Sequence, residues 1–478
     1  MRTLARLLVC FPLVASLACA GSPEEDAATH TYDLVIQGAR VMDPASGLDA
    51  VRHLGIRNGT IVAVSETPLE GERVIAATGL VVAPGFIDLH QHGRSDEAYG
   101  FAVRDGVTSA LELEVGVADI DVFYAQREDG QRVNYGASVG HIPVRMEVFD
   151  DPAKGLVPAG VGGSATAGPA ELDEIERRVR EGLGAGALAV GFGTAYTPGA
   201  DWDEIGRLFR LAAERGAAVH IHLRSGVAGL DSTIVAARDA GASLHIVHVN
   251  SSGGDDLTEF LSAIQAARQA GQDVTTEAYP YGASMTAIES ALFDDWESWP
   301  DERYHDFQWL ETGERLARES FVRYRELGGY VVIHGRSEEQ TREAVTSPLT
   351  MIASDGYIAD GLGHPRGAGS YSRVLGRYVR LEGALDLMEA LRKFTIEPAR
   401  RLEGRVPGMA RKGRIEVGAD ADLAIFDPDA VLDRATYTDP LRPPDGIPYV
   451  IVNGVLVVEE GELTGAKPGR AIRALRGA

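Results

Sequence analysis

Short apolar runs alternate with amphipathic segments through the middle of the chain. Runs between residues 85 and 355 are separated by turn residues or by stretches with helical periodicity, a pattern that predicts parallel strands joined by helices. Eight strands are expected, at residues 85–92, 106–114, 135–141, 187–193, 218–223, 244–249, 273–279 and 349–355. Eight strands with intervening helices favour a closed α/β structure, the (β/α)8 TIM barrel, over an open sheet.

Three of the connections are clearly amphipathic. They predict helices at residues 169–183, 202–215 and 258–270. The segment 280–348 is longer than a single connecting helix requires, so we expect an insertion there with an extra strand at residues 330–334. The barrel and its insertion are expected to span residues 85–399.

The two ends of the chain share a different pattern, short strands separated by turns. Residues 32–84 contain turn pairs such as Asn58-Gly59, and the far end contains expected strands at residues 414–417, 423–426 and 449–452. We expect residues 32–84 and 400–465 to form one small composite β-sandwich domain beside the barrel.

The first residues are typical of an export signal. Arg2 and Arg6 precede an apolar run at residues 7–15 that is too short to span a membrane. Residues 1–20 are therefore interpreted as a signal peptide and residues 21–31 as an acidic tether. Both cysteines, Cys10 and Cys19, lie in the signal segment, so we expect no disulfide and no thiolate ligand in the mature protein.

The end of this segment suggests a lipid anchor. Residues 16–19 resemble a bacterial lipobox, in which Cys19 becomes the lipidated first residue, although Ser16 stands where leucine is usual. The alternative is ordinary signal-peptidase cleavage after Ala20. Both readings predict export, and the first predicts a periplasmic or outer-membrane lipoprotein.

Charge limits the partners that the protein is expected to bind. The chain has 70 acidic and 46 basic residues, a net charge of −24, and its sequence shows no basic patch. Such a chain repels nucleic acid and anionic lipid surfaces, so we expect a small-molecule substrate and no membrane contact beyond the anchor at Cys19.

Residues that bind metal ions recur where the predicted strands end, which is the end of a barrel that carries catalytic groups. Because side chains alternate along a strand, His90 and His92 point to the same face. Four other strand ends carry further candidates, namely Glu112 and Glu114, His220 and His222, His248, and Asp355. Imidazole and carboxylate ligands together favour one or two divalent ions, above all Zn²⁺.

Several motifs resemble known families. Residues 83–92 resemble the signature of the amidohydrolase superfamily, and residues 418–423 are similar to its C-terminal β-domain motif. A more specific set resembles the N-acyl-D-amino-acid deacylase (D-aminoacylase) family, at residues 195–199, 279–281, 350–356, 364–366 and 373–378. The similarity extends over residues 32–465.

The resemblance implies a role for individual residues. It makes His90 and His92 ligands at one metal position, His222 and His248 ligands at the other, and Asp355 the catalytic acid/base. It also implies that the substrate's α-carboxylate is bound by Arg366, Tyr279 and Ser284.

The chain departs from the resembled family at the second strand. Better-known members carry a bridging cysteine there, and this chain offers Glu112 or Glu114, of which Glu114 lies nearer the strand end. We expect Glu114 to be the bridge. The fourth strand, residues 187–193, has no lysine, which disfavours relatives such as hydantoinases that use a carbamylated lysine.

The expected reaction is hydrolysis of an amide by activated water, with Asp355 moving the proton to the leaving amine. Tyr279, or His141 at the end of the third strand, is expected to stabilise the oxyanion, and Arg224 to add a positive charge. The preferred substrates are N-acyl-D-amino acids or dipeptides with a C-terminal D-residue. One alternative is another exported amidohydrolase, either a cyclic amidohydrolase or a dipeptidase. A second alternative is a non-catalytic metal-binding surface protein, which is disfavoured because such a protein has no need of a proton-transferring residue like Asp355.

Overall fold

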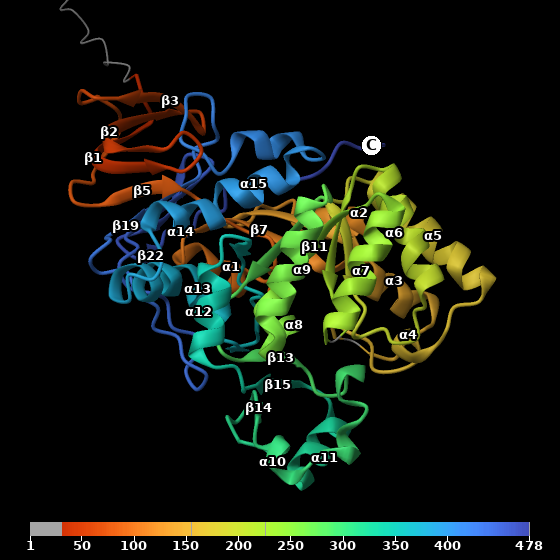
Figure 1. The fold of residues 1–478 in the computed structure, drawn as a ribbon. Helices are drawn as coiled ribbons and strands as arrows, with labels where there is room; N and C mark the ends of the chain where they lie inside the picture. The colour runs from red at the N-terminus through yellow and green to blue at the C-terminus, as the bar shows by residue number, and fades with distance from the viewer. Residues whose placement is uncertain (1–30, 154, 225, 478) are drawn as a thin grey trace, which may run out of the picture.

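The computed structural model describes residues 31–153, 155–224 and 226–477, and its centre is a nearly closed barrel of eight parallel strands (Figure 1). The barrel strands are β6 (Phe86–Asp88), β7 (Val107–Val117), β8 (Asn134–Gly140), β9 (Ala189–Gly193), β10 (Ala218–His222), β11 (Ser243–Ile246), β12 (Val274–Ala278) and β16 (Thr350–Ile352). Each pairs with the next barrel strand in sequence. Beyond β16, the Ser354 amide donates to Asp88 and the Gly356 amide to the His90 carbonyl, which joins the eighth strand to the first. The predicted TIM barrel is confirmed.

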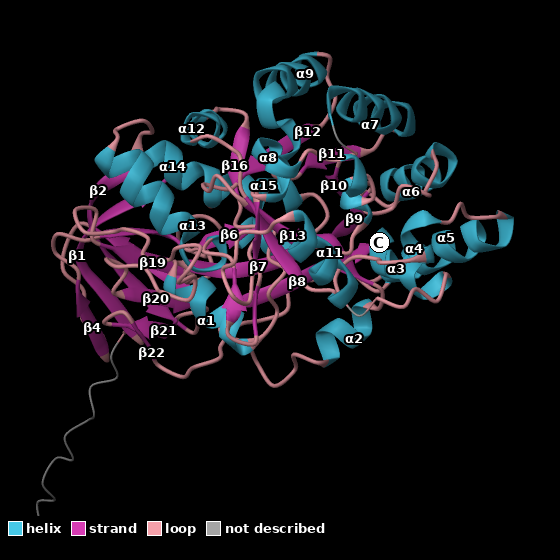
Figure 2. Ribbon diagram, turned by 90° about the horizontal axis from the view of Figure 1, so that it is seen from below, coloured by secondary structure: helices cyan, strands magenta, loops and turns pink. Residues whose placement is uncertain are grey.

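Helices cover the outside of the barrel, as Figure 2 shows from below. They include α1 (Asp96–Arg104), α2 (Ile120–Ala125), α3 (His141–Val148), α5 (Pro169–Gly184), α6 (Trp202–Glu214), α7 (Gly226–Ala240), α8 (Val249–Gly253), α9 (Leu257–Gln269), α12 (Glu338–Thr346), α13 (Arg366–Arg373), α14 (Leu387–Phe394) and α15 (Ile396–Glu403). The predicted helices coincide with α5, α6 and α9. Helix α6 begins after Asp201, whose carboxylate accepts hydrogen bonds from two backbone amides of the first turn. The apolar face of this helix buries Leu208 and Phe209 against the strands. Among the described residues, no helix is both long and apolar enough to cross a membrane.

A composite β-domain contains strands from both ends of the chain. Its strands are β1 (Leu34–Asp43), β2 (Leu48–Arg57), β3 (Thr60–Ser65), β4 (Arg73–Ala76), β5 (Val81–Pro84), β19 (Leu423–Phe426), β20 (Tyr449–Val452), β21 (Val455–Glu459) and β22 (Glu462–Leu463). The two halves meet where β5 pairs antiparallel with β19, with Pro84 opposite Leu423. Figure 1 shows these N-terminal and C-terminal strands side by side.

The predicted strand at residues 414–417 is wrong. Ile415 is 3% exposed and packs in the core of the β-domain, but its amide donates to the Asp43 carboxylate rather than to a neighbouring strand. Gly413 and Gly418 on either side adopt positive φ, which turns the backbone away from an extended path. The apolar pattern therefore reflects burial without strand pairing.

The segment between β12 and α12 forms a separate layer at one end of the barrel (Figure 1). It contains β13 (Ser284–Ala287), α10 (Asp301–Tyr304), β14 (Phe307–Trp309), α11 (Arg318–Leu327) and β15 (Tyr330–Ile333), and its three strands pair in the order β13-β15-β14. An aromatic core that includes Trp299, Phe307 and Phe321 holds it together. Strands β13 and β15 lie over the carboxyl ends of the barrel strands.

Candidate active site

A cavity of about 220 Å³ lies at the carboxyl ends of the barrel strands. The predicted residues His92, Glu114, His222, His248, Asp355, Ser284 and Arg366 all line it. They come from β7 and β10, from the segments that follow β6, β11 and β16, from β13 of the insertion, and from the start of α13. The barrel therefore brings together residues that are up to 274 positions apart, as expected for strand ends that meet around one axis.

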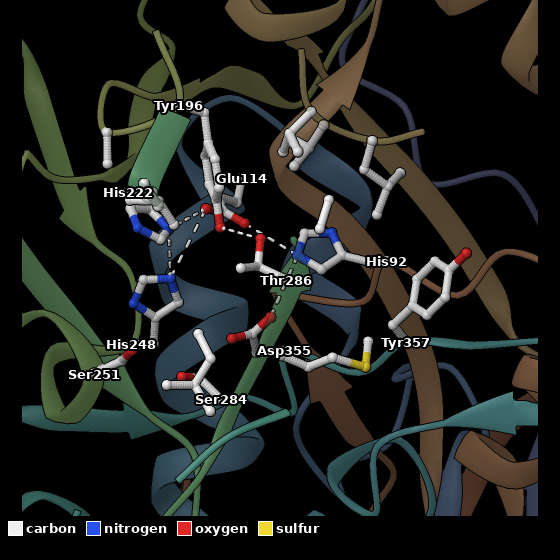
Figure 3. A pocket seen from close by; sticks show the side chains of 18 of the residues that line it. His92, Glu114, Tyr196, His222, His248, Ser251, Ser284, Thr286, Asp355 and Tyr357 are labelled. Carbon is white, nitrogen blue, oxygen red and sulfur yellow. Dashed lines mark hydrogen bonds and ion pairs between the residues drawn. The ribbon is translucent and has the colours of Figure 1, made fainter. Parts of the chain in front are cut away.

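The Glu114 carboxylate lies at the centre of this group (Figure 3). Its Oε2 is 2.8 Å from His90 Nε2 and 3.0 Å from His92 Nε2. Its Oε1 is 2.9 Å from His222 Nδ1 and 3.8 Å from His248 Nε2. One oxygen thus faces each pair of histidines, which is the arrangement that a bridging carboxylate requires.

The histidine nitrogens converge on the same space. His90 Nε2 is 3.1 Å from His92 Nε2, and His222 Nδ1 is 3.0 Å from His248 Nε2. The Asp355 Oδ1 atom lies 3.5 Å from His90 Nε2 and 3.3 Å from His92 Nε2. Donor atoms of His90, His92 and Asp355, and those of His90, Glu114 and His248, each lie within 4.8 Å of one another. This donor set of imidazoles and carboxylates fits one or two divalent transition-metal ions.

Opposite charges offset the cost of burying these groups. Burial lowers the pKa of His90, but the Asp355 and Glu114 carboxylates outweigh that effect and hold the pKa well above its usual value. Burial likewise raises the pKa of Glu114, yet the surrounding histidines keep it well below its usual value. In this cluster, the carboxylates therefore stabilise the protonated histidine and the histidines stabilise the ionised carboxylate.

A second set of contacts orients the histidines from behind. The Glu112 Oε2 atom lies 2.9 Å from His92 Nδ1, so Glu112 supports His92 and points away from the centre that Glu114 occupies. Glu277 does the same for His90, with Oε1 2.6 Å from His90 Nδ1, and its other oxygen lies 3.0 Å from His245 Nε2. Carboxylates in this position fix the tautomer and the orientation of a ligating imidazole. Glu277 was not predicted from the sequence, although an acidic residue inside an expected barrel strand was a signal.

Asp355 faces a cation on its other side. Its Oδ2 lies 2.8 Å from Nη1 of Arg366, whose side chain is 2% exposed. The Arg366 guanidinium lies 4.7 Å from the ring centroid of Tyr279, and the Tyr279 hydroxyl accepts a hydrogen bond of 2.6 Å from Arg336. Tyr279 is therefore buried behind Arg366 and is not among the residues that line the cavity.

Two site residues have an uncommon backbone conformation. His248 and Asp355 adopt positive φ, 34° and 51°, which is uncommon for residues with a side chain. Both follow barrel strands directly, at the sharp change of direction into the next segment. Strain of this kind persists where the surrounding structure enforces it and concentrates at functional sites.

Besides Tyr279, two predicted residues point away from the cavity. His141 is the first residue of α3, and its Nε2 lies 2.7 Å from Glu204 while its ring stacks on Phe192. The helix start turns the side chain outward, toward α6, so this position does not support an oxyanion role. The Arg224 side chain donates to the carbonyls of Thr194, Thr197 and Ala200, so it holds the loop after β9 instead of facing substrate. Tyr196 of that loop does line the cavity, with its ring 4.8 Å from His222.

A TIM barrel with four histidines, a central carboxylate and an aspartate at its strand ends defines the amidohydrolase class. A sequence model of the amidohydrolase family matches residues 144–458, and the chain belongs to this family. It is a hydrolase of carbon–nitrogen bonds other than peptide bonds.

Individual relatives have known activities that are narrower than the family description. The chain is 31% identical to the N-acyl-D-glutamate deacylase of Alcaligenes xylosoxydans xylosoxydans over 92% of its own length and 96% of the relative's. Its structure is similar to that of N-acyl-D-glutamate deacylase from Bordetella bronchiseptica complexed with zinc and a phosphonate inhibitor that mimics the tetrahedral intermediate, with a TM-score of 0.79, 26% identity and coverage of 93% and 100%. A D-aminoacylase with a binuclear metal centre matches with a TM-score of 0.77, 25% identity and coverage of 92% and 100%.

Proposed function

We propose that the protein is a metal-dependent deacylase that hydrolyses the amide bond of N-acyl-D-amino acids, or of dipeptides with a C-terminal D-residue. The observation that carries the proposal is the position of Glu114 between two histidine pairs, with Asp355 and Arg366 beside them in one cavity. The relatives that act on N-acyl-D-amino acids support the choice of substrate class.

Each part of the site has a defined task in this proposal. His90 and His92 would hold one ion and His222 and His248 the other, with Glu114 as the residue that could serve both; Zn²⁺ would suit this donor set best. A bound divalent ion supplies Lewis acidity, which polarises the substrate carbonyl and lowers the pKa of water.

Asp355 and Arg366 act on the substrate. Asp355 accepts the proton of the attacking water and delivers it to the leaving nitrogen, a transfer that requires a carboxylate within hydrogen-bond reach of both atoms. Arg366 lies next to Asp355 and binds the substrate's α-carboxylate, because a guanidinium offers paired donors that match a carboxylate. Ser284, on β13, lines the same part of the cavity and donates a further hydrogen bond.

The proposal is tested with purified protein and a panel of matched N-acetyl-D-amino acids, N-acetyl-L-amino acids and cyclic amides such as hydantoin. Release of the free D-amino acid, lost in Asp355→Asn with the fold retained by circular dichroism, supports it. Hydrolysis of L-substrates or cyclic amides with no D-activity would move the function to another branch of the family.

The proposed location is exported, with a lipid anchor at Cys19, and it rests on the sequence. Residues 1–30, including Cys10 and Cys19, lie outside the described residues. The basic start, the short apolar run and the lipobox-like residues 16–19 support it.

A further inference from the structure

The residues that line the cavity determine which substrates fit it. We infer that the site selects N-acyl-D-amino acids whose side chain and acyl group are both uncharged and largely apolar, over N-acyl-D-glutamate or N-acyl-D-aspartate. The inference rests on the proposed function and adds the substrate class.

One apolar wall lies beside Arg366. The Nη2 atom of Arg366 is 3.5 Å from the Met285 carbonyl, which places the proposed carboxylate-binding group next to β13. Met285 and Ile333 line this side, together with the rings of Tyr330 and Tyr357, whose centroids are 4.8 Å apart. Groups attached to the substrate's α-carbon lie near this wall when its carboxylate is bound by Arg366.

A second apolar surface adjoins the first, because Ala287 lies opposite Tyr330 in the β13–β15 pair. It consists of Val115, Leu156, Val157, Ala287 and Leu292, which pack against one another and against Tyr196. Whichever half of the substrate faces each wall, it meets aliphatic or aromatic carbon. Burying a leucine-sized side chain on such a surface favours binding by roughly 10- to 150-fold.

Charge in the cavity argues against a second carboxylate on the substrate. Among the described residues that line it, Arg366 is the only lysine or arginine, and it already pairs with Asp355 at 2.8 Å. Glu114 and Asp355 also line the cavity, and a carboxylate offers no hydrogen-bond donor to a second carboxylate. A buried carboxylate without a cation is strongly disfavoured, so once Arg366 holds the α-carboxylate a glutamate or aspartate side chain has no partner.

Two arginines near the cavity do not line it, and their guanidinium groups have other hydrogen-bond partners. Arg224 is occupied by backbone carbonyls, and Arg336 donates to the Tyr279 hydroxyl. Lys154 precedes Leu156 in the sequence but lies outside the described residues, so a variant at this position belongs in the test. The inference departs from the activity of the relative at 31% identity, which is a D-glutamate deacylase.

The sharpest test compares N-acetyl-D-glutamine with N-acetyl-D-glutamate, which differ in charge and hardly in size. We expect kcat/KM to be at least about 10-fold higher for glutamine, and higher again for N-acetyl-D-leucine and N-acetyl-D-methionine. Equal or better hydrolysis of the glutamate substrate would overturn the inference and leave the proposed deacylase function intact. Absence of activity on every D-substrate would overturn the proposed function and the inference with it.

A pair of variants tests the physical cause. Ile333 is half-buried on β15, so Ile333→Arg adds a cation to the wall beside Arg366, and Ile333→Gln is the neutral control. We expect only Ile333→Arg to raise the ratio of glutamate to glutamine hydrolysis, by about 10-fold or more. The Lys154→Met variant is expected to keep the wild-type ratio. A wild-type preference for glutamate that disappears in Lys154→Met would refute the charge balance described above.

Discussion

Glu114→Gln and Glu112→Gln are a matched pair of substitutions that tests the centre of the site. Both remove one charge from β7 with little change in shape, and both residues are buried, at 3% and 2% exposure. Only Glu114 lies within 3.0 Å of nitrogens on three histidines, whereas Glu112 contacts His92 from behind. Comparing the two variants therefore distinguishes a carboxylate that binds metal directly from one that only orients a histidine ligand.

The expected difference is large. Two unit charges 4 Å apart interact by about 4 kcal/mol at an effective dielectric constant of 20, and a divalent ion increases that value. Loss of the Glu114 charge should therefore weaken metal binding by about 1000-fold or more, since 1.4 kcal/mol is tenfold. Glu112→Gln acts only through the orientation of His92 and should cost about 10- to 100-fold.

The measurement is metal content by mass spectrometry after dialysis at a series of buffered Zn²⁺ concentrations, with thermal unfolding as the control for folding. Equal losses in the two variants, or a larger loss in Glu112→Gln, would refute the assignment of Glu114 as the bridge. Wild-type protein from metal-supplemented medium that holds less than about a tenth of an equivalent of any transition metal would refute metal dependence itself.

Three further predictions concern other parts of the molecule. Arg366→Lys should lower kcat/KM about 10- to 150-fold on N-acyl-D-amino acids and much less on the corresponding amides, because lysine lacks the paired donors; equal losses on both would make Arg366 structural. Lys393 donates to the carbonyls of Ser347 and Thr350, and burial lowers its pKa to about 8, below the 10.5 of the unfolded chain. The unfolded state therefore binds more protons than the folded state between pH 8 and 10.5, so the free energy of unfolding should rise with pH in this window. On going from pH 7 to 9.5, the wild type should gain about 1–2 kcal/mol of stability relative to Lys393→Met, as measured by denaturant unfolding. A difference between the two proteins that does not change with pH would contradict this. Cys19→Ala should move the protein from the membrane fraction to the soluble exported fraction, whereas a mature terminus at Gly21 in the wild type would contradict lipidation.

Much of the barrel could be predicted because its signal is local. Strands buried on both faces are short apolar runs, and amphipathic helices such as α6 separate them. The rule that catalytic groups lie at strand ends then identified His92, Glu114, His222 and His248 as neighbours without any knowledge of distances.

The failures arise where a residue's partner is distant in sequence. Ile415 is buried like a strand residue, but the Asp43 side chain takes its amide, and no local pattern contains that pairing. His141 was expected to end a strand, but β8 ends at Gly140 and His141 begins α3, so its ring lies toward Glu204. Glu277 lies within β12 and not at its end, and only the closed barrel shows that it reaches His90 across 187 positions.

The composite β-domain also constrains how the polypeptide is made. Strand β5 ends at Pro84 and its partner β19 begins at Leu423, so the first half of this sheet leaves the ribosome without the strand that covers its edge. Roughly 340 residues separate them, which at 5–20 residues per second is a delay on the order of 20–70 s. An unpaired edge exposed for that time is a site for association with other nascent chains. Holding the chain unfolded until synthesis is complete, as a translocation chaperone does, removes that hazard.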